Sequence, residues 1–485
     1  MASLDSSPAH PEPEPDCPTQ RAWGFIPPLY LAEGIPYVVV NTVAGLMYNK
    51  LGIPNDQMAL WTSLIAFPWT LKMLWGPLVD LTMTRRRWIL GTQAGLAAGM
   101  LGVVLALAVP AYFPLTLALF TLVAFLSATH DIAADGFYLL ALSPRQQAFF
   151  VGVRSTFYRL ATIFASGYLV YLAGTLIEGR GAEGATPPWL GLLDGLLTGV
   201  LTNPTARAWG VALTVGAGAY ALLFLLNLIL LPRPPGDRSS PTSPGTPASR
   251  RPPPPPATAA PPSSSPHSSP VAWSDAFRTF FSQPKIGWIL AFIVFYRFGE
   301  SMISKLAGPF LQEPLEKGGL GVATSQVGVI QGTYGVAALT VGGILGGVVI
   351  SRFGIKRCLW PMVLALNLPN LAYLWAALTK PGLAAVTALL VTDQFGYGFG
   401  FSAYMVYLMF VCQGARYQTS HYAIATGLMA LGALFAGIVS GYVQTHLGYA
   451  GLFLTVLVLG VPGIVTLFFI PMDREDIRVA PVDLD

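Results

Sequence analysis

Two stretches far apart in the chain decide its fold: residues 76–87 read GPLVDLTMTRRR, and residues 347–357 read GVVISRFGIKR. Each comes at the end of a long apolar run, and each passes from a small residue through a polar residue to a basic turn. They lie about 271 residues apart in a chain of 485 residues. This recurrence predicts a duplicated unit.

Composition places that unit in a membrane. Only 10% of the residues are charged, whereas a soluble domain is about 25% charged. A helix that crosses the hydrocarbon core needs roughly 20 apolar residues, and the chain contains six such runs followed by six more. We therefore predict an all-α integral membrane protein with 12 transmembrane helices in two six-helix bundles. The predicted spans are 23–48, 58–79, 88–110, 114–142, 147–176, 208–232, 286–311, 324–350, 358–379, 383–411, 420–445 and 449–471.

A stretch of different composition separates the two halves. Residues 233–272 are almost wholly Pro, Ser, Ala, Thr and Gly. Such a segment cannot bury enough apolar area to fold, so we predict a disordered linker, with a docking role for its Pro-rich centre as the alternative. The expected organisation is a disordered tail (1–22), an N-terminal bundle (23–232), the linker (233–272), a C-terminal bundle (273–472) and a second tail (473–485).

The basic residues predict the orientation of the chain. Seventeen lie in the tails, the linker and the loops on one side of the predicted spans, and five lie in the loops on the other side. Because cytoplasmic loops carry an excess of Lys and Arg, we predict that both termini are cytoplasmic. The outer loop 177–206 contains WLGLLDGLLTGVL, which is too short to span the membrane and predicts an interfacial helix.

The repeated segment also carries a family resemblance. GPLVDLTMTRRR resembles the signature of the loop between helices 2 and 3 in the major facilitator superfamily, although Leu81 stands where a basic residue is usual. ALWTSLIAFPWTLKMLWGPLVD (59–80) and ATHDIAADGFYLLALSPRQQAFFVGVRSTFYR (128–159) resemble the anhydromuropeptide permease (AmpG-type) family and the related acetyl-CoA transporter. The motif resemblance is concentrated in residues 25–170. It implies a secondary active transporter that moves a small polar solute by alternating access.

The resemblance further implies a substrate and an energy source. It favours proton-coupled import of a cell-wall muropeptide across a bacterial inner membrane, with acetyl-CoA or another anionic metabolite as the alternative. The chain lacks GxxxxGK[ST], so we expect no nucleotide cofactor and a proton gradient as the energy source. The richness in Ala, Pro and Arg agrees with a bacterial origin.

Ten ionisable residues fall inside the predicted spans. Each costs on the order of 2.5–3.5 kcal/mol at mid-membrane, so each needs a reason to be there. Five are acidic and five are basic, and complete mutual pairing in a purely structural role is the first alternative. The ten are Glu33, Lys72, Asp131, Asp135, Arg154, Arg159, Arg297, Glu300, Lys305 and Asp393.

The fourth span carries two of the acids. Asp131 and Asp135 are one helical turn apart and therefore share a face. The resemblance implies that Asp135 clamps the basic residues of loop 2–3 at an inner gate, and contact with substrate is the alternative. Asp131 follows His130 and is a candidate for proton or substrate binding, with Lys72 or Arg159 as its basic partner.

The first and seventh spans, which line the central cavity in the superfamily, carry Glu33 and Glu300. Gly34 and Pro36 follow Glu33, and we expect them to break the helix and free backbone groups for ligand binding. Arg297 and Glu300 are three residues apart, so an ion pair within the helix is the alternative to a cavity role for Glu300.

The tenth span contains Asp393 and Gln394, followed by the glycine- and aromatic-rich stretch 396–404. No strand precedes this stretch and residue 401 is Phe, so it does not predict a dinucleotide site. Its aromatic rings could form a stacking wall for a sugar or an amide. Ordinary helix packing is the alternative.

These considerations assign three roles. The proton-coupling candidates are Glu33, Asp131, Glu300 and Asp393. The substrate-binding candidates are Lys72, Arg159, Arg297, Lys305, Gln394 and Tyr404. The gating or structural candidates are Gly76, Asp80, Arg85, Arg86, Arg87, Asp135, Arg154, Gly347 and Arg352.

Other classes of protein fit the sequence less well. The rivals are an intramembrane enzyme built around His130 and Asp131, for which HExxH and GxSxG are missing, and a receptor without transport. Three cysteines without close spacing predict no metal site, and a net charge of +4 gives no ground for nucleic-acid binding. Small residues spaced by four in the eighth span (Gly342/Gly346 and Gly343/Gly347) and in the eleventh (Ala433/Gly437/Gly441) predict close helix packing within one chain. We therefore expect a monomer in the lipid bilayer with a small-molecule substrate.

Overall fold

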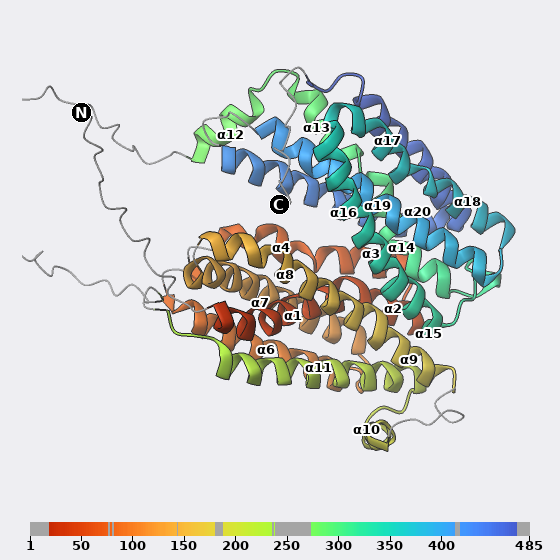
Figure 1. Ribbon diagram of the computed structural model, residues 1–485. Helices are drawn as coiled ribbons and strands as arrows, with labels where there is room; N and C mark the ends of the chain where they lie inside the picture. The colour runs from red at the N-terminus through yellow and green to blue at the C-terminus, as the bar shows by residue number, and fades with distance from the viewer. Residues whose placement is uncertain are drawn as a thin grey trace, which may run out of the picture.

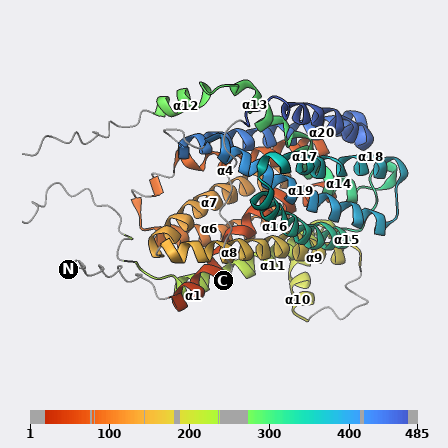
Figure 2. The same cartoon turned by 45° about the horizontal axis from the view of Figure 1, so that its top comes forward.

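The computed structural model describes residues 19–75, 78–79, 82–142, 144–179, 188–234, 237, 273–412 and 418–472. Within them every regular element is a helix. Figures 1 and 2 show two bundles, one from the N-terminal half of the chain (red to green) and one from the C-terminal half (green to blue). The predictions for Gly76, Asp80, most of the linker and most of the two tails lie outside the described residues.

The helices of the N-terminal bundle follow the six predicted spans. Their bounds are α1 Thr19–Val38, η1 Val39–Val43, α2 Ala44–Lys50, α3 Asn55–Leu64, α4 Phe67–Leu71, η2 Lys72–Leu74, α6 Arg85–Ala106, α7 Tyr112–Ala141, α8 Pro144–Thr162, η3 Ile163–Leu169, α9 Val170–Ile177, α10 Pro188–Thr198 and α11 Pro204–Leu230.

The C-terminal bundle repeats this arrangement. Its bounds are α12 Trp273–Phe281, α13 Ile286–Phe295, α14 Phe298–Gln312, η5 Leu315–Lys317, α15 Thr324–Val327, η6 Gly328–Gly335, α16 Val336–Phe353, α17 Ile355–Asn367, α18 Pro369–Thr379, α19 Leu383–Cys412 and α20 Gln418–Thr466.

The number of spans agrees with the prediction. Ten helices of the described chain are long and apolar enough to cross a membrane, with α20 counted once. Gly448 has φ 69° and divides α20 into two spans, because this left-handed conformation is open mainly to glycine. The second predicted span, broken into three short helices, completes the twelve.

The break in the second span corrects the expectation of a continuous helix over 58–79. Helices α3 and α4 are separated at Ile65 and Ala66. Pro68 has no N–H to donate to the carbonyl of Leu64, and its ring would clash with that carbonyl in a straight helix. The interruption comes just before Lys72, which begins the 3₁₀ turn η2.

The first span was expected to be broken but is continuous at the expected place. We expected Gly34 and Pro36 to break it, but α1 continues through both and the π-helix η1 follows. Gly34 instead permits close packing, because a Cβ added there would lie 2.7 Å from the Cβ of Ala161 in α8. The expectation of a broken first helix is therefore wrong at this glycine and proline.

Two short helices lie at the edges of the bundles. Figures 1 and 2 show α10 and α12 at the periphery, where α10 contacts α11 and α12 packs on α20 through the buried ring of Phe280, which meets His421. The helix expected in loop 177–206 is α10, and its Asp194 accepts a hydrogen bond from Nε of Arg207 in α11 at 2.9 Å.

The basic loop between the second and third spans supports neighbouring helix ends. Arg86 donates to the carbonyl oxygens of Leu228 (2.7 Å) and Leu231 (3.2 Å) at the C-terminus of α11. Asp237 accepts hydrogen bonds from the backbone N–H groups of Arg85 and Arg86 at the start of α6. These contacts satisfy backbone groups that a helix leaves unpaired at its ends, so they give Arg86 a structural role.

The two bundles are joined at one end of the molecule, near α2, α9 and α15 in Figure 1, which we call the sealed end. Asn49 and Asn55 donate to Oε1 of Glu313 at 2.8 and 2.6 Å. Glu178 accepts hydrogen bonds from the backbone N–H and the hydroxyl of Ser325 at 3.0 and 2.6 Å. Among the described residues, all side-chain hydrogen bonds between the halves lie at this end.

Glycines allow the helices of the sealed end to approach each other closely. A Cβ at Gly332 in η6 would lie 2.2 Å from the carbonyl oxygen of Ser166 in η3. A Cβ at Gly174 in α9 would lie 2.0 Å from the backbone nitrogen of Ser325 in α15. These distances exclude any side chain, so the seal depends on backbone-to-backbone contact between the fifth and eighth spans.

We expect Gly332→Ala to push the two halves apart at the sealed end. The added methyl group cannot be accommodated, and overpacking typically costs about 1–3 kcal/mol. The matched control is Gly347→Ala in the same span, because a Cβ there meets nothing within 4 Å. The measurements are the melting temperature of the purified protein and the thiol labelling of a cysteine placed at Ser325, with the native cysteines replaced.

The Gly332→Ala protein should melt at a lower temperature and label faster at position 325, while the Gly347→Ala protein should match the parent. Equal labelling rates in both variants would show that the seal does not depend on this glycine.

Candidate functional site

The ten charged residues of the spans do not pair completely. Three ion pairs form: Lys72 with Asp131, Arg154 with Asp135 at 3.0 Å, and Arg297 with Glu300 at 3.1 Å. The expectation of full mutual neutralisation is therefore wrong for the described part of the chain. The four members that have no ionic partner among the described residues are Glu33, Arg159, Lys305 and Asp393.

The first ion pair depends on the broken second span. Lys72 begins the 3₁₀ turn after α4, and its ammonium group reaches the carboxylate of Asp131 in α7. The Lys72 side chain is 37% exposed and the Asp131 side chain is 15% exposed. Of the two basic partners expected for Asp131, the structure brings Lys72 to it.

The second ion pair gives Asp135 a partner inside the N-terminal bundle. Its partner is Arg154 of α8, whose Nη1 also lies 3.2 Å from the hydroxyl oxygen of Tyr30. The guanidinium stacks over the rings of Tyr30 and Tyr138, at 4.9 and 5.3 Å from their centroids. Arg86 is turned toward α11, whereas the side chain of Arg85 lies beside Gly136, where an added Cβ would be 2.7 Å from its Nε. The clamp of loop 2–3 by Asp135 stays a prediction.

Glu33 lies beside this cluster, in contact with Asp131 but without a basic partner among the described residues. Its Oε2 atom is buried and has no hydrogen-bond partner among the described residues. The charged groups that act on it from the neighbouring helices belong to Asp131, Asp135 and Arg154. The N-terminal bundle therefore holds three neighbouring carboxylates and two bases.

His130 takes no part in this cluster. Its Nε2 lies 3.0 Å from Nε2 of Gln93 in α6, and its side chain is buried on the other side of α7 from the ion pairs. This geometry separates His130 from Asp131, although the two are adjacent in sequence, because successive residues of a helix point about 100° apart.

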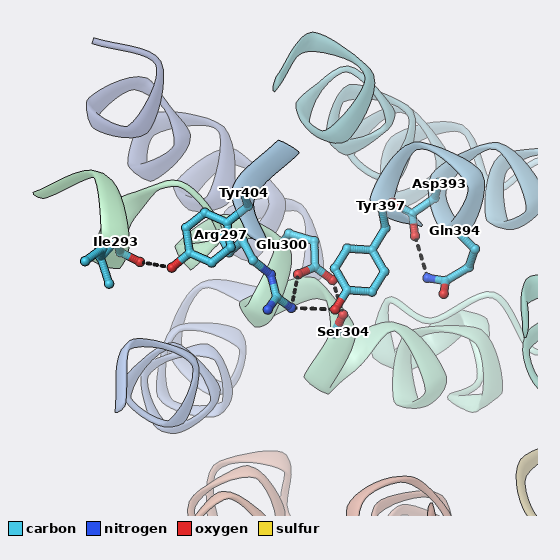
Figure 3. A network of polar contacts seen from close by, with 8 residues as sticks. All are labelled: Ile293, Arg297, Glu300, Ser304, Asp393, Gln394, Tyr397 and Tyr404. Atoms are coloured by element: carbon cyan, nitrogen blue, oxygen red, sulfur yellow. Dashed lines mark hydrogen bonds and ion pairs between the residues drawn. The ribbon is translucent and has the colours of Figure 1, made fainter. Parts of the chain in front are cut away.

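The third ion pair belongs to a polar network in the C-terminal bundle, shown in Figure 3. Arg297 lies at the break between α13 and α14, with φ −114° and ψ 4°. Its Nη2 atom donates to Glu300 at 3.1 Å and to the hydroxyl oxygen of Tyr397 at 2.6 Å. Ser304 donates to the other oxygen of Glu300. The pair within the seventh span, which was the alternative for Glu300, is confirmed.

Two aromatic rings complete the surroundings of Arg297. Its guanidinium carbon lies 4.9 Å from the ring centroid of Tyr397 and 4.7 Å from that of Phe401. Cation–π contact of this kind stabilises a guanidinium that is partly removed from water. The aromatic-rich stretch 396–404 thus supplies a wall for the arginine of a neighbouring span.

Asp393 is buried deeper in the same bundle, with 5% of the residue exposed. Its Oδ2 accepts hydrogen bonds from the hydroxyl of Tyr373 at 3.0 Å and from Nε2 of Gln394 at 3.1 Å. Figure 3 shows Asp393 and Gln394 beside Tyr397 on α19. Both expected residues therefore lie together, but Gln394 is bonded to Asp393.

Tyr404 is not available to a substrate. It is 0% exposed, and its hydroxyl donates to the carbonyl oxygen of Ile293 at 2.6 Å. Its ring stacks on Tyr296, with 4.9 Å between the centroids. Tyr404 follows Tyr397 by two helical turns on the same face, but α13 covers that face at its level. The expectation that Tyr404 binds substrate is therefore wrong.

The second copy of the repeated turn does not repeat the contacts of the first. Arg352 is exposed and makes no hydrogen bond or ion pair with the described residues. Gly347 has open space around it, whereas Gly342 and Gly346 lie against the backbone of α19. The predicted close packing of the eighth span is thus confirmed for Gly342 and Gly346 and wrong for Gly347.

Several neutral residues of the site could not be predicted from the sequence. The spacing of four residues between Glu300 and Ser304 was the available indication for one of them. The others come from different spans and have no such pattern. These residues are Tyr30, Ser304, Tyr373 and Gln331, which lines a small cavity beside Lys305. Tyr397, by contrast, lies in the aromatic-rich stretch 396–404 that the sequence had pointed to.

We expect Arg297→Leu to destabilise the protein by about 3 kcal/mol, because it leaves the carboxylate of Glu300 buried without a cation. Adding Glu300→Leu should recover most of this loss. The control is Arg207→Leu, which breaks a more exposed pair and should cost less than about 1 kcal/mol. The side chains of Arg297 and Glu300 are 15% and 4% exposed, against 27% and 35% for Arg207 and Asp194.

Melting temperatures of the four purified proteins test this expectation. A double variant no more stable than Arg297→Leu would mean that the arginine acts through Tyr397 and Phe401 and not through charge neutralisation.

Comparison with known proteins agrees with this architecture. Residues 28–422 match the model of the Major Facilitator Superfamily. The chain is 25% identical over 459 residues to the anhydromuropeptide permease of Escherichia coli (strain K12), covering 93% of this chain and 80% of that protein. It is 22% identical over 459 residues to a putative transporter AmpG 4 of Rickettsia conorii, covering 91% of this chain and 94% of that protein.

Solved structures show the same fold. A bacterial homologue of the human lysosomal transporter Spinster, in an inward-facing and unoccupied conformation, matches with a TM-score of 0.66 at 16% identity, over 94% of this chain and 97% of that chain. A D-xylose-proton symporter matches with a TM-score of 0.59 at 12% identity, over 93% and 96%. Because the superfamily model spans most of the sequence, the chain belongs to the Major Facilitator Superfamily and is a multi-pass membrane transporter.

Proposed function

We propose that this transporter imports a small acidic solute together with a proton across the bacterial inner membrane, and that a cell-wall muropeptide is the favoured substrate. The observation that carries the proposal is Glu33, whose buried oxygen lacks a hydrogen-bond partner beside two other carboxylates. The proton gradient supplies the energy, and no cofactor takes part.

Charge balance supports a proton on Glu33. The cluster contains Glu33, Asp131 and Asp135 but two bases, Lys72 and Arg154. With both ion pairs formed, the third carboxylate has no cation. An uncompensated charge at mid-membrane costs on the order of 2.5–3.5 kcal/mol, and a proton removes this cost.

The ion pair next to Glu33 offers a route for coupling to the substrate. The partly exposed ammonium of Lys72 can exchange Asp131 for an acidic group of the substrate. Asp131 then becomes a second carboxylate that needs a proton. A loaded carrier with a neutral cluster can reorient, whereas one with an uncompensated charge cannot do so at low cost.

The distribution of basic residues supports an orientation. The loops of the sealed end are poor in Lys and Arg, so this end faces the outside in our proposal and both termini face the cytoplasm. In that orientation the structure is the inward-open state, from which the substrate is released.

Two features support an acidic sugar-peptide as the substrate. Arg159 and Lys305 have no carboxylate partner among the described residues, so they are available for acidic groups of a ligand. The anhydromuropeptide permease of Escherichia coli is similar over 93% of the chain. Acetyl-CoA is the second candidate, because its phosphates suit the same two cations.

We expect Glu33→Gln to abolish uphill uptake but to retain exchange. The amide cannot release a proton, so a pH gradient should no longer drive accumulation, while labelled and unlabelled substrate should still exchange across the membrane. The measurement is uptake of a labelled anhydromuropeptide by proteoliposomes, with at least a tenfold loss of gradient-driven accumulation. The matched control is Glu316→Gln in the exposed turn η5.

The parent protein tests the wider proposal in the same vesicles. Accumulation should collapse with a protonophore, and a panel that includes acetyl-CoA identifies the substrate. Uptake by Glu33→Gln equal to the parent would refute the role of Glu33, and flux in the parent that ignores the gradient would refute symport. Chemical conversion of a compound without transport would favour the enzyme alternative.

A further inference from the structure

We propose that Lys305 and Gln331 form a subsite for the terminal carboxylate of a peptide, in a small cavity between the two halves of the molecule. This inference rests on the proposed transport of an acidic solute and specifies which part of that solute is recognised, and where.

The subsite is a small cavity between the two halves of the molecule. Residues of α3, η1 and α2 form one wall, and residues of α14 and η6 form the other. The polar residues that line it are Asn41, Thr42, Thr62, Ser304, Lys305 and Gln331. None of the lining residues is acidic. Lys305 is thus a cation whose local surroundings supply amide and hydroxyl groups but no counter-ion.

The neighbouring acid of the same helix does not neutralise Lys305. Both oxygens of Glu300 are engaged, one by Arg297 and the other by Ser304. The stem of Lys305 passes beside Gly437 of α20, where an added Cβ would lie 3.8 Å from its Cδ. An ammonium group within a membrane protein needs an anion or water, and here the ligand can supply the anion.

Gln331 defines the chemistry of the ligand more closely. Its Oε1 atom is buried and has no hydrogen-bond partner among the described residues. A ligand that fits both residues carries an anion for Lys305 and a hydrogen-bond donor for Gln331. The C-terminus of a peptide has this combination, because its carboxylate lies two bonds from its last amide N–H. A phosphate ester has no donor in the equivalent place.

The size of the cavity restricts what enters it. Its volume of about 70 Å³ is far below the 300–1,000 Å³ typical of a site that encloses a whole small molecule. It therefore takes an end group, while the rest of the substrate lies outside it. Ser304 lines the subsite and donates to Glu300, so a bound carboxylate is one hydrogen bond away from the Arg297 network.

Both halves contribute to the subsite, so it is complete only when the sealed end is closed. A ligand that binds there adds stability to the closed arrangement and not to the opened one. Recognition of the carboxylate would therefore also favour the step that closes the outer end behind an incoming substrate.

The test compares acid and amide forms of two probes with the purified full-length protein. The probes are an anhydromuramyl peptide and N-acetyl-dialanine, each with a free carboxylate and with the carboxylate converted to an amide. A charge-assisted hydrogen bond predicts that the parent prefers each acid by about tenfold or more. Lys305→Gln should bring the ratio of acid to amide affinity close to one. Lys317→Gln, which changes an exposed lysine of η5, should keep the preference.

Gln331→Leu is the second variant, and it tests the subsite independently in case Lys305→Gln fails to fold. It should weaken acid and amide alike, because Gln331 meets the N–H group that both forms carry. An acid preference that survives in Lys305→Gln, or that is missing from the parent, would overturn the subsite. A Lys305-dependent preference for acetyl-CoA over acetyl-pantetheine, without one for the peptide acids, would assign the cation to phosphate and equally overturn it.

The outcome is separable from that of the proposed function. Lys305-dependent binding of N-acetyl-dialanine without transport of the muropeptide would leave the subsite standing and refute the substrate. Proton-driven uptake of the muropeptide in its acid and amide forms alike would support the proposed function and refute the subsite.

Discussion

The cost of an unpaired charge in hydrocarbon is the constraint on which this structure depends. With 10% of its residues charged, the chain keeps most of them in loops and tails and places ten in its spans. Six of these ten form three ion pairs, and in two of the pairs the arginine makes a further contact, with Tyr30 for Arg154 and with Tyr397 for Arg297. The pairs make it possible for the rest of the bundle to be apolar.

The four charged residues that form no ion pair with the described residues are the candidates for function. An ion pair inside a membrane can be purely structural, because it neutralises itself. A single charge cannot neutralise itself. A carboxylate such as Glu33 must be balanced by a proton or by water, and an ammonium such as Lys305 by water or by an anionic ligand. The two lie in different halves, Glu33 beside the acids of α7 and Lys305 in the small cavity between the halves. The terminal carboxylate of the substrate would thus be bound apart from the proton, while another acidic group of the substrate meets Lys72 beside Glu33.

The closure of one end follows from a different kind of contact. Glycines of the fifth and eighth spans bring two backbones within a distance that no side chain allows, and amide–carboxylate hydrogen bonds around Glu313 secure the same end. Such contacts are directional and lose little entropy when they form, because glycine has no side chain to order and the asparagines are short. They can therefore be broken and remade as units, which a transporter that alternates between two states requires.

The sequence by itself determined the number of spans, the division into two bundles and the identity of the ten membrane charges, because hydropathy and charge depend on residue type alone. It also located the Arg297–Glu300 pair, since three residues along a helix suffice to define a contact. The tertiary structure decided everything that depends on helix rotation and on breaks. Pro68 moved Lys72 onto Asp131, α13 covered Tyr404, and α8 supplied Arg154 to Asp135. Glu33 and Lys305 were left unpaired for the same reason: the partner of a buried charge is set by which neighbouring helix faces it, and residue type carries no information about that.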